Sequence, residues 1–194
     1  IQKKVGPFVA RLTPHKKKLR KTQWEDSKVN LDFPFNPEGF HFGKVSDKEI
    51  LVDNIEIAGK KWRVIINASP VEEYASMIVP MPEYTANQYL DAQDVEALVA
   101  FLKMSKSSVF FNTLWAGASV NSKHFQLYYS QPYGIRFIEE NEDLNWTNIG
   151  GVEIADLVGY PGNIFALRSE DKDKLAIATW AAIKYMQNNN IPYN

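Results

Sequence analysis

The stretch Ser-Val-Asn-Ser-Lys-His-Phe-Gln-Leu-Tyr-Tyr, residues 119–129, has the alternating pattern of a β-strand from Ser122 onward. Side chains along a strand point in turn to its two faces. One face would carry a polar set, formed by Ser122, His124 and Gln126. The other face would carry a mostly apolar set, formed by Lys123, Phe125 and Leu127. This pattern predicts a strand that buries one face in the core and lines a cleft with the other.

Further short strands and two helices are predicted around this stretch. The first helix is expected over residues 91–105 with Asp91 as its N-cap, and the second over residues 169–189 with Ser169 as its cap. Residues 152–157 fit either a short strand or a helical turn. Strands are expected at residues 50–52, 55–57, 62–66, 75–79, 108–114, 122–129, 134–139 and 163–167. Several strands with two separated helices predict an α+β fold with a largely antiparallel sheet.

The chain is expected to divide near residue 45. Residues 1–45 would form a basic N-terminal arm and an aromatic, proline-rich strap, and residues 46–194 would form the α+β domain. Aromatic residues alternate with turn formers between Phe33 and Phe42, which suits rings that pack into a core while the backbone stays irregular. Residues 3–21 contain lysines and arginines but no acidic residue. This arm is predicted either to contact an acidic partner, which could be a protein patch, an anionic lipid or a nucleic acid, or to be a solvated extension.

The composition excludes several kinds of site. The 194 residues carry a net charge of -1 and no cysteine, so disulfides and thiolate metal sites are ruled out. With three histidines, a structural zinc site would need Asp or Glu to complete its four ligands, and we expect neither a metal nor another cofactor. No apolar run reaches the roughly 18–20 residues that cross a bilayer. No secretory signal is visible, so a cytoplasmic or organellar protein is expected rather than a secreted one.

The polar face around His124 suits nucleotidyl transfer. A neutral imidazole can attack an α-phosphate and hold the nucleotide as a phosphoramidate. Gln126, two residues further on the same face, could donate to the non-bridging oxygens as charge builds. Upstream, Asn112 and Ser119 could supply further donors. The alternative is a histidine that is satisfied in a polar seam and has a structural role.

A longer motif strengthens the first interpretation. Asn112, Gly117, Ser119, His124 and Gln126 are spaced as Asn-x-x-x-x-Gly-x-Ser-(x4)-His-x-Gln. This motif resembles the core of the GDP-hexose phosphorylases, in the galactose-1-phosphate uridylyltransferase branch of the histidine-triad superfamily. Further segments resemble the same family in the same order, so that the resemblance spans about residues 33–194. These segments are residues 33–45, 66–70, 78–80, 157–161 and 190–194.

The resemblance implies a histidine-triad-like fold and a nucleotide sugar as substrate. It makes His124 the nucleophile that becomes guanylylated and Gln126 a glutamine that contacts phosphate. The substrate-binding residues that it implies are Asn112, Ser119, Asn121 and Ser122. The implied reaction converts a GDP-hexose and phosphate into a hexose 1-phosphate and GDP.

Departures from the family pattern leave the activity open. Ser122 replaces the first histidine of His-x-His-x-Gln, Lys123 replaces an apolar residue, and Ser76 replaces the histidine of a Tyr-Gly-His motif. A positioned acid–base group is typically worth about 10²–10⁴-fold in rate. In the family, the segment that matches residues 190–194 leads into further strands. We therefore also consider a catalytically degenerate domain that serves as a structural subunit, with a partner that completes the sheet after Asn194.

Overall fold

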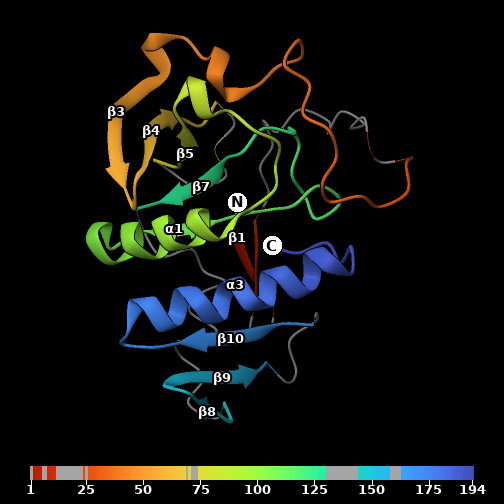
Figure 1. Cartoon of the computed structure of the whole chain (residues 1–194), viewed down its shortest axis with the longest axis vertical. Coiled ribbons are helices and arrows are strands. Elements are labelled where there is room, and N and C mark those ends of the chain that lie inside the picture. The colour runs from red at the N-terminus through yellow and green to blue at the C-terminus, as the bar shows by residue number, and fades with distance from the viewer. Residues whose placement is uncertain are drawn as a thin grey trace.

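The computed structural model describes two larger antiparallel sheets and two long helices (Figure 1). The residues that it describes are 2–5, 8–11, 24, 26–68, 70, 74–129, 144–157 and 163–194. The α+β class with largely antiparallel sheets is therefore confirmed. None of the described helices has the length and apolar character that a membrane span requires.

The larger sheet has five strands in the order β3-β4-β5-β7-β6, and every neighbouring pair is antiparallel. Its strands are β3 (Ile50–Ile57), β4 (Lys60–Ile66), β5 (Ser76–Pro80), β6 (Ser108–Phe110) and β7 (Phe125–Tyr128). Three short 3-10 helices flank it, namely η1 (Phe42–Lys44), η2 (Asp47–Glu49) and η3 (Pro82–Tyr84).

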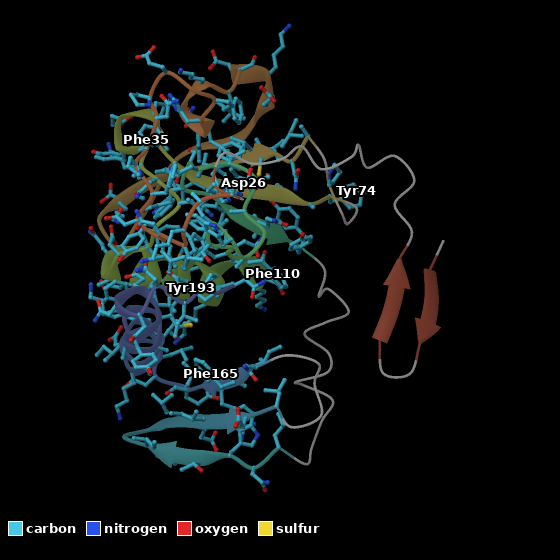
Figure 2. The ribbon with its side chains drawn as sticks, turned by 90° about the vertical axis from the view of Figure 1, so that its right-hand side faces the viewer. Asp26, Phe35, Tyr74, Phe110, Phe165 and Tyr193 are labelled. Atoms are coloured by element: carbon cyan, nitrogen blue, oxygen red, sulfur yellow. The ribbon has the colours of Figure 1, made fainter. Side chains whose placement is uncertain are left out.

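The smaller sheet has three strands in the order β10-β9-β8. These strands are β8 (Thr147–Ile149), β9 (Val152–Asp156) and β10 (Phe165–Arg168). The two helices, α1 (Ala92–Ser105) and α3 (Lys172–Asn188), lie between the two sheets (Figure 1). A separate hairpin of β1 (Gln2–Val5) and β2 (Phe8–Arg11) stands to one side of both sheets in Figure 2.

The five-stranded sheet has two different faces, as the strand alternation requires. The helix face carries Trp62, Val64, Ile78, Phe125 and Leu127, which form the main core with residues of α1 and α3. The opposite face, here called the strap face, is apolar over β4 and β5. Its buried members are Ile65, Met77, Val79 and, from the strap, Phe42. The strap thus packs against the sheet through an aromatic ring, as predicted.

The helix starts follow local capping chemistry. The Asp91 carboxylate accepts from the Asp94 N–H, and the Asp94 carboxylate accepts from the Asp91 N–H, so α1 begins with a complete capping box. The predicted Asp91 cap is confirmed. For α3 the predicted Ser169 cap is wrong, because Asp171 accepts from the N–H groups of Asp173 and Lys174. A carboxylate at this position can accept both orphan donors, whereas the Ser169 hydroxyl bonds to Gly151 O.

Most predicted strands are present with shifted ends. Residues 50–52 and 55–57 form one irregular strand, and residues 152–157 form a strand rather than a helical turn. The predicted strands 108–114 and 122–129 are both too long, because β6 ends at Phe110 and β7 begins at Phe125. The hairpin in the N-terminal arm was not predicted. The predicted strand 134–139, residues 12–21 of the arm and residues 158–161 of the family motif lie outside the described residues.

Candidate active site

His124 lies immediately before β7, with its side chain on the strap face and only 7% exposed. Its ring Nδ1 is 2.8 Å from the carbonyl oxygen of Ser122. A carbonyl oxygen can only accept, so Nδ1 must carry the proton in this contact. The lone pair of the neutral imidazole is then on Nε2, which bonds to no described residue.

The surroundings of His124 favour the neutral ring. Burial lowers the pKa of the imidazole, and the hydrogen bond to the Ser122 carbonyl opposes this effect only in part. A pKa below the ordinary value of about 6.5 leaves the ring uncharged at neutral pH. His124 therefore has a neutral ring with a defined tautomer.

The strap covers the other side of this histidine. The Phe42 ring lies 4.8 Å from the imidazole, centroid to centroid, and the Phe42 N–H donates to Ser122 Oγ at 3.2 Å. Ser122 itself has no exposed surface. The strap therefore packs on two of the polar residues that were expected to line a cleft, and the cleft itself stays a prediction.

A lysine holds the strap in shape. The Lys44 ammonium donates to the carbonyl oxygens of Pro37, Glu38 and Gly39, at 2.7, 3.2 and 2.9 Å. An ammonium has three protons, so these three acceptors use its full donor capacity. Lys44 is thus committed to the turn that precedes Phe42 and is not placed to bind phosphate.

Gln126 lies on the strap face of β7, opposite Met77 of β5 and Phe110 of β6. Its Oε1 accepts from the Tyr128 hydroxyl at 2.7 Å. With the carbonyl oxygen of the amide engaged in this way, its NH2 group can donate to a substrate oxygen. The structure therefore places Gln126 on the same face as His124, as predicted.

Asn112 lies near His124, and Ser119 lies in an exposed loop. The ladder between β6 and β7 ends at the pair Phe110 and Gln126, so its continuation would bring Asn112 level with His124. A Cβ atom on Gly117 would lie 3.9 Å from Asn112 Cγ, which places this turn beside the Asn112 amide. Ser119 is exposed in the loop that follows. Their predicted contacts with substrate stay predictions.

Asn121 binds protein groups through both ends of its side-chain amide. Its Nδ2 donates to the carbonyl oxygens of Phe33 and Pro34, and its Oδ1 accepts from the Gln88 N–H at 2.9 Å. The Asn121 side chain therefore joins three segments of the fold. The Ser122 hydroxyl likewise accepts from the strap, so direct contact of either residue with substrate stays a prediction.

Ser76 does not lie beside His124. It pairs with Leu127, on the helix face, and its hydroxyl is 3.4 Å from the Tyr129 hydroxyl. His124 and Gln126 point to the opposite face of the sheet. A side chain at position 76 would therefore not reach the His124 ring in this fold, because alternation along β5 turns it to the helix face.

Two buried polar residues at the site were missed. Gln88 hydrogen-bonds to the backbone of both Asn112 and His124. Lys123, predicted to lie among apolar residues, has its ammonium 2.5 Å from Asp94 Oδ2. The only signal in the sequence was indirect, since a lysine on an apolar strand face requires a buried acid elsewhere. In the described part of the chain, no group of three or more His, Cys, Asp or Glu side chains could hold a metal ion.

Comparison with known proteins shows that the chain is similar to phosphorylases. Residues 4–128 match the family model described as "GDPGP1-like, N-terminal domain". GDP-L-galactose phosphorylase 2 of Arabidopsis thaliana is 30% identical over an alignment of 213 positions, which covers 96% of this chain and 48% of the relative. GDP-D-glucose phosphorylase 1 of Danio rerio is 28% identical over 163 residues, which cover 82% and 47%. The chain spans about half the length of these relatives, and no solved structure matches it significantly.

Proposed function

Since the chain belongs to the family of GDPGP1-like N-terminal domains, we propose that it transfers a nucleotidyl group from a nucleotide sugar to phosphate, with His124 as nucleophile. The observation that carries this proposal is the state of the imidazole. Nδ1 is bonded to the Ser122 carbonyl, burial keeps the ring neutral, and Nε2 retains its lone pair. A histidine-triad-like mechanism needs this tautomer.

The reaction proceeds in two displacements. Nε2 of His124 attacks the α-phosphorus of the nucleotide sugar, and the bond from this phosphorus to the bridging oxygen breaks. The bridging oxygen leaves with the electron pair as part of the sugar 1-phosphate. An oxygen of inorganic phosphate then attacks the same phosphorus, the P–N bond breaks, and Nε2 recovers its lone pair. The second product is a nucleoside diphosphate.

Neighbouring side chains stabilise the charge that develops in both steps. The Gln126 NH2 group, on the same face as His124, donates to a non-bridging oxygen of the α-phosphate. Asn112, Ser119, Asn121 and Ser122 are the proposed substrate-binding residues. Because Phe42 covers one side of the imidazole, the nucleotide reaches Nε2 past the strap. The names of the relatives point to a GDP-hexose as the first substrate to test.

The test is covalent labelling with GDP-glucose or GDP-galactose that carries ³²P at the α-position. We expect a label on the protein that is stable to alkali and lost in acid, as a phosphoramidate is. His124→Ala should abolish this label. His41→Ala is the matched control, because this second histidine packs against Phe35 rather than against the site. Phosphate should discharge the label as GDP.

A catalytically degenerate domain with a structural role is the alternative. The contact of Phe42 with His124 and the complete burial of Ser122 favour it, because both reduce the room for a nucleotide. It predicts that wild type and His124→Ala both remain unlabelled and turn over no GDP-hexose. It also predicts a stable complex with another polypeptide. A protein that is a monodisperse monomer by native mass spectrometry would contradict this prediction.

A further inference from the structure

Gln88 is a buried glutamine whose side chain bonds to the backbone on both sides of the site. It lies between η3 and α1 and is 1% exposed. Its Nε2 donates to the carbonyl oxygens of Asn112 and His124, at 3.0 and 3.1 Å. Its Oε1 accepts from the His124 N–H at 2.9 Å. One amide therefore satisfies both backbone polar groups of His124.

This amide lies where the sheet ladder stops. Strands β6 and β7 pair from Ser108 and Tyr128 to Phe110 and Gln126. The next pair in the same register and on the same face would be Asn112 with His124, but Gln88 bonds to both residues there instead. The side-chain amide thus takes the place of backbone pairing. It also joins the segment that follows β6, at Asn112, to the segment that precedes β7, at His124.

The orientation of the Gln88 amide is unambiguous. Two carbonyl oxygens require the donating NH2 end, and one N–H requires the accepting oxygen end. A flipped amide would place oxygen against oxygen at two contacts. The segment that carries Gln88 is fixed as well, since the Gln88 N–H donates to Asn121 Oδ1 and the Lys123 N–H donates to Ala86 O.

We propose that Gln88 is the positioning residue of the His124 site, and that its amide sets the separation of His124 from Asn112. It acts through the backbone of both residues and does not touch substrate. The proposal rests on the proposed function for its effect on rate, but not for its effect on the imidazole. A side-chain displacement of about 1 Å can cost on the order of 10²-fold in rate.

The first arm of the test uses the protein without substrate. In Gln88→Met, which keeps the side-chain length and removes all three hydrogen bonds, the His124 main-chain amide should exchange with deuterium roughly tenfold faster. By NMR titration, the pKa of the imidazole should rise toward about 6.5, because a displaced ring gains water. Gln187→Met is the matched control, since Gln187 is also buried but donates to Leu90 O and the Tyr193 hydroxyl. It should change neither quantity.

The second arm uses the ³²P label. Gln88→Met should lower the labelling rate by on the order of 10²-fold, with a far smaller change in the GDP-hexose concentration at half-saturation. An unlabelled wild type would refute the proposed function, while the exchange and titration results would still decide the role of Gln88. The proposal would be overturned if Gln88→Met and the shorter Gln88→Asn both kept the wild-type exchange rate of the His124 amide and the wild-type pKa of its imidazole. If neither variant folds, exchange of the His124 amide in wild type as fast as that of exposed Ser119 would overturn it.

Discussion

The buried carboxylate of Asp94 gives a prediction about two variants. We expect Lys123→Met to restore part of the stability that Asp94→Asn loses. Asp94 is 1% exposed on its side chain and binds two ammonium groups, Lys60 at 2.6 Å and Lys123 at 2.5 Å. The Lys123 side chain is 8% exposed, and its other acid, Asp91, is 3.8 Å away. In Asp94→Asn, Lys123 keeps its charge in a buried position and loses its close partner. In Lys123→Met, Asp94 still has Lys60 and the N-terminal end of α1.

The magnitudes follow from this asymmetry. Removing one partner of a buried ion pair costs about 3–5 kcal/mol, because a buried charge is left uncompensated. Asp94→Asn should lower the free energy of unfolding by this amount. Lys123→Met loses one hydrogen bond to a charged group, which is worth about 1.5–3 kcal/mol. In the double variant no ammonium is stranded, so it should be more stable than Asp94→Asn by about 1 kcal/mol or more.

Urea unfolding of the four proteins measures these differences, with the midpoint shifting at a constant slope. Glu153→Gln is the control, because it removes the acid from the exposed pair with Arg168 and should shift the midpoint far less. The reasoning would be refuted by a double variant that is no more stable than Asp94→Asn. It would also be refuted by equal costs for Asp94→Asn and Glu153→Gln.

Two further predictions concern the imidazole and the strap. Because burial lowers the pKa of His124, the unfolded chain binds this proton first as the pH falls. Stability should therefore be full above about pH 6.5 and decline below it, and urea midpoints in His124→Asn should decline less over the same range; parallel curves would contradict this. Ser122→Ala leaves the buried Phe42 N–H without its acceptor and should cost about 1–3 kcal/mol, whereas exposed Ser119→Ala should cost almost nothing. Equal midpoints for these two variants would contradict the strap contact.

The sequence predicted the features that depend on residues close together in the chain, such as strand faces and helix caps. The alternation after Ser122 assigned Phe125 to the core and His124 to the opposite face, because the period of a strand is two. The Asp91 cap could be predicted because the residue and the N–H group that it caps lie within one turn of α1. The resemblance of several ordered motifs likewise predicted the family, which the match over residues 4–128 confirms.

Contacts between distant segments could not be predicted in this way. The hydrogen bond from the Phe42 N–H to Ser122 joins residues 80 positions apart. Neither segment alone therefore indicates that the strap packs on Ser122 and His124. The ends of β6 and β7 were misplaced for a related reason. Both segments keep a strand-like pattern, but Gln88, from a third segment, bonds to Asn112 and His124 where the ladder would continue.

The polar groups around His124 are held by contacts with other segments of the fold. In residues 121–124 the Asn121 amide, the Ser122 hydroxyl, the Lys123 ammonium and the His124 backbone all bind groups from other segments. Buried polar groups are normally paired, and this segment follows that rule closely. The exception among the described contacts is Nε2 of His124, which bonds to no described residue while Nδ1 is fixed. Nε2 is therefore the atom on which the proposed chemistry depends, and the labelling of wild type against His124→Ala decides whether it acts.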